Sequence, residues 1–232
     1  MKIGVSGCSN SSFGWGNPWH VFMGEKYGAE VISSSSRGAG NEMNVEKIKY
    51  ILDHNELDFF VYQVTEPSRL VLGTTKGEHE LGLHSSNIFN DSCYYTFNGH
   101  RNDANISRIF NQNYKLDEFM VHNVVPSKYN TNYKVFHTLM SINQLCDFYG
   151  VKVFFFSWFS DLHKLAEESG YSHIINKLHV MNGTVEEFVN RQQLKPIPGD
   201  CHFDSDNHKI IYEQFIHPQL EQLTNSQLKK LF

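Results

Sequence analysis

Residues 57–64 read LDFFVYQV, a nearly continuous apolar run with the length of a buried strand. Two shorter strand-like runs come before it, MKIGVSG at 1–7 and AEVIS at 29–33. The segments between these runs have apolar residues at helical spacing; one starts at Pro18 and the other is capped by Asn41. Strand, helix, strand, helix and strand in this order predict a parallel sheet with right-handed crossovers.

Helical patterns return in the second half of the chain, with one further strand among them. A strand, VKVFFFSW, is expected at 151–158, and helices are expected at 116–124, 132–149, 161–169, 185–193 and 206–223. Residues 67–105 break the rhythm with glycines and many polar residues, so we expect an insertion or lid there. The length of 232 residues, 40% of them hydrophobic, fits one α/β domain over 1–232.

Composition argues against several classes of protein. The chain carries 20 Lys and Arg against 25 Asp and Glu, so no broad basic field is expected to attract nucleic acid. No apolar run approaches the roughly 20 residues of a membrane helix, and no signal peptide is recognised. Four cysteines without a Cys-x-x-Cys pair indicate neither a disulfide scaffold nor a zinc ribbon. We therefore expect a soluble cytoplasmic protein with no nucleic-acid or membrane partner and an unknown oligomeric state.

Four loops of the predicted fold gather polar groups. In a doubly wound sheet, ligands bind beyond the carboxyl ends of the strands, where such loops lie. A serine, a glycine loop, further donors, and a carboxylate beside an imidazole are the groups that acyl transfer through a serine requires. They are Ser9 after the first strand, Gly38, Gly40 and Asn41 after the second, Gln63 and Thr65 at the third, and Asp200 and His202 before the last helix.

The motifs in these loops resemble those of the SGNH or GDSL-type hydrolases. Gly7-Cys8-Ser9 stands for the family's Gly-Asp-Ser and keeps the serine, while Gly38 or Gly40 matches the glycine of the second motif. The third motif, Gly-x-Asn-Asp, is replaced by Gln63-Val64-Thr65-Glu66. Thr65, Gln63 or the nearby Asn41 would then have to supply the donor of the missing asparagine.

The family's last motif is Asp-x-x-His, which fails at His208 because Ser205 stands three residues before it. A variant of the motif, Asp-x-His with a later histidine, matches Asp200-Cys201-His202 followed by His208. The resemblance therefore implies that Asp200 and His202 are the partners of Ser9, with His208 as the reserve candidate.

The resemblance covers nearly the whole chain in its order of elements and implies a three-layer α/β/α flavodoxin-like sandwich with a mostly parallel sheet. It also implies a serine esterase or acetylhydrolase that cleaves or transfers a short acyl group of a small-molecule or carbohydrate ester, without a cofactor. Ser9 would be the nucleophile, His202 the base and Asp200 the residue that orients the base. The backbone N–H groups of Ser9 and of Gly38 or Gly40, with one side-chain donor, would bind the oxyanion.

Three other functional classes stay open at this stage. A metal-dependent hydrolase would draw its ligands from His202, Asp204, Asp206 and His208. A binding protein without activity on the same fold is an alternative because two of the family's motifs are altered. A nucleotide-binding module is weakly supported, since neither of the common phosphate-binding glycine motifs follows a strand.

Two further residues carry interpretations of their own. The thiol of Cys8 stands next to the candidate nucleophile, so it would be able to act as the nucleophile itself or to pair with Cys201. Arg37, in the glycine loop, would be able to bind an anionic group of a substrate.

Overall fold

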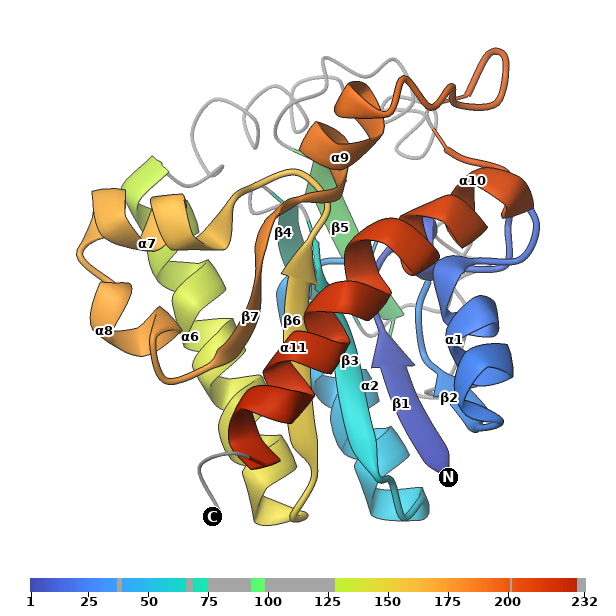
Figure 1. Cartoon of the computed structure of the whole chain (residues 1–232). Helices are drawn as coiled ribbons and strands as arrows, with labels where there is room; N and C mark the ends of the chain where they lie inside the picture. Colours follow the sequence, from blue (N-terminus) through green and yellow to red (C-terminus); the bar gives the residue numbers. More distant parts are fainter. Residues whose placement is uncertain (37–38, 66–68, 75–92, 99–127, 201, 229–232) are drawn as a thin grey trace.

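The computed structural model describes residues 1–36, 39–65, 69–74, 93–98, 128–200 and 202–228. At its centre lies a five-stranded, entirely parallel sheet with the strand order β2-β1-β3-β6-β7 (Figure 1). This is the flavodoxin-like order, in which the chain reverses its direction of travel after the second strand. The predicted fold class is thus confirmed. The strands are β1 (Lys2–Ser6), β2 (Glu30–Ser33), β3 (Phe59–Val64), β6 (Lys152–Ser157) and β7 (His179–Thr184).

Helices cover both faces of the sheet and complete the three layers (Figure 1). One face is covered by α1 (Trp19–Tyr27), α9 (Val185–Arg191), α10 (Ser205–Ile211) and α11 (His217–Leu228). The other face is covered by α2 (Asn41–His54), α6 (Lys128–Phe148), α7 (Leu162–Ser169) and the short α8 (Ser172–Ile175).

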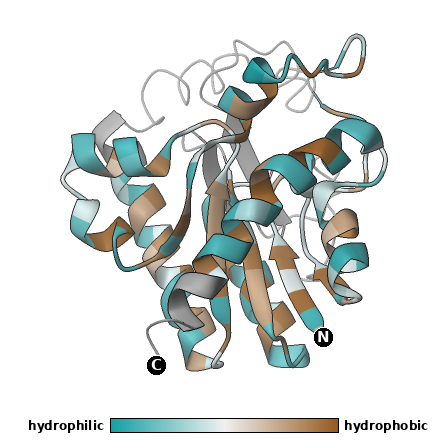
Figure 2. Ribbon diagram, viewed as in Figure 1, coloured by the Kyte–Doolittle hydropathy of each residue, from teal (hydrophilic) through white to brown (hydrophobic). Residues whose placement is uncertain are grey.

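The two helical layers explain the apolar run that dominates the sequence. In β3, Val61 belongs to the hydrophobic core on one face, whereas Phe60 and Tyr62 belong to the core on the other. Since successive side chains of a strand point to opposite faces, a strand covered on both sides buries apolar residues at every position. Hydrophobic residues accordingly run along the central strands (Figure 2).

The end of the chain departs from the expected single helix over 206–223. It consists of α10, a π-helical stretch η3 (Tyr212–Ile216) and α11, which follow one another without a break. In addition, β7 and α8 were not expected. The sequence of β7, HVMNGT, contains Asn182 and Gly183, residue types that are depleted in strands. Its pairing with β6 is irregular between Phe155 and Ser157, which accommodates this polar end of the strand.

The expectation that Asn41 caps a helix is wrong. Gly40 occupies the N-cap position of α2, with no side-chain capping bond, and Asn41 is the first residue of the helix. The Asn41 carboxamide is bonded instead to Tyr62 and Thr65 at the end of β3, so it is not available to the helix N-terminus.

Part of the predicted insertion at 67–105 is described. It contains a two-stranded antiparallel sheet of β4 (Arg69–Thr74) and β5 (Cys93–Asn98). The remainder of that segment and the expected helix at 116–124 lie outside the described residues.

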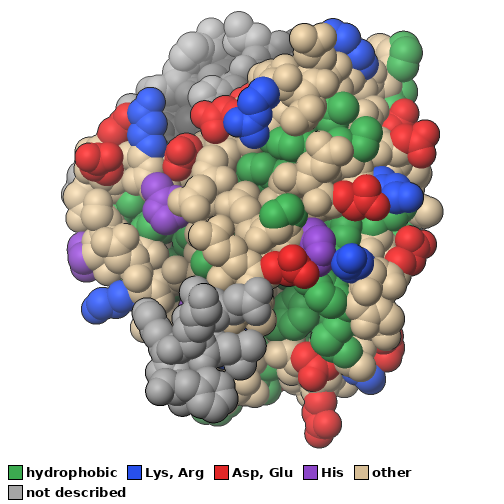
Figure 3. Space-filling view, in the orientation of Figure 1, with side chains coloured by type: hydrophobic (Ala, Val, Ile, Leu, Met, Phe, Trp, Pro, Cys, Tyr) green, Lys and Arg blue, Asp and Glu red, His purple; other side chains and the backbone are tan. Residues whose placement is uncertain are grey.

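The surface seen in Figure 3 carries acidic and basic side chains interspersed over the described part of that face. Among the described residues, none of the helices has both the length and the apolar character needed to cross a bilayer.

Candidate active site

Ser9 lies in the loop that follows β1, at the carboxyl end of the sheet. It opens a single 3₁₀ turn, η1 (Ser9–Ser11), whose backbone is held by a hydrogen bond from Ser11 N to the Cys8 carbonyl of 2.9 Å. The Ser9 carbonyl accepts from both the amide and the hydroxyl of Ser12. Cys8, Asn10 and Ser11 are buried, whereas Ser9 itself is partly exposed. The turn therefore presents one hydroxyl at the surface from a backbone fixed on both sides.

A buried polar network anchors this turn to the sheet. The Ser11 hydroxyl donates to Gln63 Oε1 over 2.6 Å and accepts from the indole N–H of Trp19 over 2.7 Å. The Gln63 amide donates to Cys8 Sγ over 3.1 Å. Gly7 passes close to this network, because a Cβ at that position would lie 2.8 Å from Gln63 Cβ. The tight approach explains why a glycine precedes the turn.

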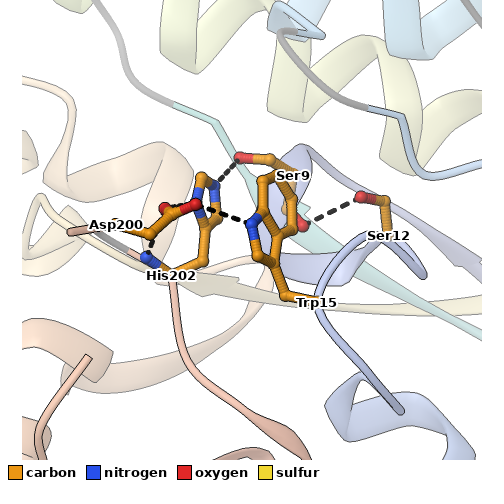
Figure 4. Close-up of polar contacts among 5 residues, drawn as sticks. All are labelled: Ser9, Ser12, Trp15, Asp200 and His202. Carbon is orange, nitrogen blue, oxygen red and sulfur yellow. Dashed lines mark hydrogen bonds and ion pairs between the residues drawn. The ribbon is translucent and has the colours of Figure 1, made fainter. Parts of the chain in front are cut away.

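His202 brings the loop before α10 into contact with this turn (Figure 4). Its Nε2 lies 2.9 Å from Ser9 Oγ, and its Nδ1 lies 2.5 Å from Asp200 Oδ1. Because a carboxylate only accepts, Nδ1 carries the proton and Nε2 is left to accept from the Ser9 hydroxyl. Ser9, His202 and Asp200 are therefore brought together in a chain of hydrogen bonds, in the order that the sequence predicts.

Asp200 receives donors on both carboxylate oxygens. Oδ1 also accepts from the backbone N–H of His202 over 3.0 Å, and Oδ2 accepts from the indole N–H of Trp15 over 2.7 Å. The hydrogen bond from the His202 side chain is the main reason why the pKa of Asp200 is lowered to about 2. Asp200 is therefore ionised at neutral pH and able to hold the imidazole in one tautomer.

Trp15 was not singled out by the sequence analysis. Its ring lies parallel to the His202 imidazole, with the centroids 3.5 Å apart and the planes 8° apart (Figure 4). The available signal was an aromatic residue between two glycines, Gly14 and Gly16, shortly after Ser9. That signal does not indicate what the tryptophan contacts, because nothing in it shows that the loop reaches residues near position 200.

The residues expected to donate to the oxyanion differ from one another in their hydrogen bonds and burial. Asn41 Oδ1 accepts from the Tyr62 hydroxyl (2.8 Å) and the Thr65 amide (2.9 Å), and Asn41 Nδ2 donates to the Thr65 carbonyl (3.3 Å). Gln63 is fully buried beneath the Ser9 turn. Thr65 Oγ1 is buried and has no hydrogen-bond partner among the described residues. Gly40 is buried at the N-terminus of α2, whereas Gly38 and Arg37 lie outside the described residues.

His208 has a different environment from His202. It is buried within α10 next to the Trp158 ring, with the centroids 5.9 Å apart, and its Nδ1 has no partner among the described residues. Burial lowers its pKa to about 4, so it is neutral at neutral pH. The structure places it as a packed side chain of the core.

The remaining alternatives can be compared with the described residues. No group of three or more His, Cys, Asp or Glu side chains in that part of the chain is arranged to hold a metal ion. The free thiol of Cys8 is fully buried against Gln63, whereas Ser9 is the residue that meets His202. Cys201 lies outside the described residues.

Comparison with solved structures identifies the fold. The chain is similar to the psychrotrophic esterase EstA from Pseudoalteromonas sp., with a TM-score of 0.55 and 11% identity over 97% of this chain and 98% of that one. It is also similar to TesA, with a TM-score of 0.53 and 12% identity over 96% of this chain and 99% of that one. No family model and no curated protein sequence matches the chain. The chain therefore shares the fold of these two solved structures, at very low sequence identity.

Proposed function

We propose that the protein is a serine esterase that removes a short acyl group through a covalent acyl-enzyme. The observation that carries this proposal is the bridging position of His202, 2.9 Å from Ser9 Oγ on one side and 2.5 Å from Asp200 Oδ1 on the other. A nucleophile, a base within hydrogen-bond reach and a residue that orients the base make up the arrangement used in acyl transfer. The similarity of the fold to that of the esterase EstA supports the same class of reaction.

In the acylation step, His202 Nε2 takes the proton of Ser9 as Oγ attacks the ester carbonyl. The imidazolium that forms is stabilised by the Asp200 carboxylate through Nδ1. When the tetrahedral intermediate collapses, the same proton passes to the departing alkoxide, which leaves as an alcohol. The acyl group is then bonded to Ser9 Oγ.

In the second step, water is the nucleophile and Ser9 Oγ is the leaving group. A water molecule gives its proton to His202 Nε2 and attacks the acyl carbonyl, and Ser9 recovers its proton when the acid departs. If another alcohol replaced the water, the same steps would transfer the acyl group to that alcohol. The substrate we propose is an ester, and the resemblance stated above implies that it is an ester of a small molecule or carbohydrate.

For the oxyanion we propose the backbone N–H groups of Ser9 and Gly40 together with the Thr65 hydroxyl. The carboxamide of Asn41 is bonded to the end of β3 and Gln63 is bonded beneath the turn, whereas Thr65 Oγ1 has no partner among the described residues. Thr65 also stands where the related hydrolases have their asparagine. Gly38 stays a sequence-based candidate for the same role.

The proposal is tested with p-nitrophenyl acetate and butyrate. We expect the wild-type protein to hydrolyse at least one of these esters and Ser9→Ala to lose activity by a factor on the order of 10⁶. Ser172→Ala is the matched control, because this serine is exposed at the start of α8, and it should retain full activity. Equal rates for Ser9→Ala and the control would reject the proposal.

A further inference from the structure

One side chain outside the predicted site contacts two of its members. Trp15 donates its indole N–H to Asp200 Oδ2 over 2.7 Å and lays its ring parallel to His202 with the centroids 3.5 Å apart (Figure 4). Asp200 and His202 are thus held from the same side by a residue that follows Ser9 by only six positions.

The loop that carries Trp15 is fastened to the start of α10. The backbone N–H of Asn17 donates to Ser205 Oγ over 2.8 Å. Gly16 has a φ of +118°, which favours glycine, and a Cβ there would lie 2.4 Å from Ser205 Oγ. The backbone of the loop after β1 therefore packs against the Ser205 side chain at the start of α10, directly beside the site. This contact anchors the backbone one and two residues after Trp15.

Each contact of Trp15 restrains one motion of the site. The indole N–H fixes the rotation of the Asp200 carboxylate, so Oδ1 faces both the backbone N–H and Nδ1 of His202. The stacked ring limits tilting of the imidazole, whose Nε2 must keep pointing at Ser9 Oγ. When the imidazole takes up a proton, the resulting cation lies over an aromatic face, which attracts it.

We propose that Trp15 is a positioning residue of the candidate triad, one that holds the carboxylate and the imidazole plane and stabilises the imidazolium formed during proton transfer. This inference rests on the proposed esterase function, but its structural part concerns only the pair of Asp200 and His202. The same residue thus links the first loop of the chain to the loop before α10 and sets the geometry between them.

Two variants separate the two contacts. Trp15→Phe keeps an aromatic face over His202 and removes the donor to Asp200, whereas Trp15→Leu removes both. We expect Trp15→Leu to lower kcat by about 10²-fold, the effect of a small misplacement of reacting groups, with little change in KM. Trp15→Phe should recover a large part of that loss. Phe13→Leu is the control, because this side chain is on the same loop, is 65% exposed and contacts His20 rather than the pair.

The pH profile of kcat/KM gives a readout that a general loss of stability would not move. Both variants lack the bond to Asp200, so the difference between them isolates the aromatic face. Without that face the imidazolium is less stable, and the acid limb should lie at lower pH in Trp15→Leu than in Trp15→Phe, by roughly half a pH unit. Coincident acid limbs, with equal losses of kcat in the two variants, would overturn the proposal.

A spectroscopic experiment separates this inference from the proposed function. In protein with isotopically labelled histidine, the Nδ1–H proton that His202 shares with Asp200 gives a resonance protected from exchange with water. We expect it in the wild type and in Trp15→Phe and expect its loss in Trp15→Leu. That pattern in a protein without esterase activity would reject the function and support the positioning role. A resonance unchanged in Trp15→Leu would reject the positioning role even in an active enzyme.

Discussion

The hydroxyl of Ser11 and the carboxamide oxygen of Gln63 lie 2.6 Å apart, fully buried beneath the turn that carries Ser9. This bond joins the loop after β1 to β3 at the carboxyl end of the sheet. Its position indicates that the shape of the Ser9 turn depends on Gln63, a residue whose place in the sequence suggests only an oxyanion donor.

Replacing this glutamine tests the anchoring role. Gln63→Leu leaves the Ser11 hydroxyl without its acceptor and Cys8 without its donor, so we expect the free energy of unfolding to fall by about 1–3 kcal/mol. Urea denaturation measures the change. Gln144→Leu, on the exposed side of α6, is the matched control and should change stability far less. Equal stabilities of the two variants would contradict the anchoring role.

The lowered pKa of Asp200, about 2, predicts a pH dependence of stability. A carboxyl whose pKa is lowered by folding stabilises the native state above its ordinary pKa, near 3.8, and this contribution is lost as the pH falls toward 2. The difference in unfolding free energy between the wild type and Asp200→Asn should thus change as the pH falls below 4. Urea denaturation from pH 6 to pH 2.5 measures it, and a constant difference over this range would contradict the prediction.

Burial of His208 predicts a pH dependence in a higher range. Its pKa is lowered from 6.5 to about 4, so between these values the unfolded chain binds a proton that the folded chain does not. Stability should therefore fall as the pH drops from 6.5 to 4, and His208→Phe should remove part of that fall. The buried His20, also with a pKa of about 4, accounts for a further part. An unchanged pH dependence of stability in His208→Phe would refute the prediction.

The Thr65 hydroxyl offers a test of the oxyanion assignment. Thr65→Val keeps the shape of the side chain and removes the donor, so we expect kcat for a p-nitrophenyl ester to fall by about 10²–10³-fold. The fold should be retained, because Thr65 Oγ1 bonds to no other described residue. Thr138→Val, at a buried position of α6, controls for the substitution itself. If Thr65→Val kept the activity of this control, the oxyanion donor would have to be sought elsewhere.

The layered fold was predictable because both faces of the sheet are buried. That burial leaves apolar runs such as 57–64 and 151–158 in the sequence, and the helices between them show their periodicity. The strand β7 was not predictable because Asn182 and Gly183 interrupt its apolar pattern. Its pairing with β6 is also irregular. A hydrophobic pattern in a sequence indicates burial, and a strand with a polar end has only a short pattern of this kind.

The contacts of the candidate site were predictable only in part. The pairing of Ser9 with His202 and Asp200 could be expected from two short motifs, one after the first strand and one before the last helix. The roles of Asn41 and Gln63 in holding the loops, and the stacking of Trp15, depend on directions of side chains that no spacing in the sequence encodes. The sequence favoured His202 over His208, and the structure buries His208 and places His202 against Ser9.

Covalent labelling with a fluorophosphonate shows whether His202 activates Ser9. Attack by Ser9 Oγ on phosphorus expels fluoride, and His202 takes the proton of the hydroxyl. We expect one adduct per chain, located on Ser9 by mass spectrometry of the digested protein. Labelling should persist in His208→Gln and be lost in Ser9→Ala and His202→Gln. A wild-type protein without an adduct, or with its adduct on another residue, would mean that His202 does not activate Ser9.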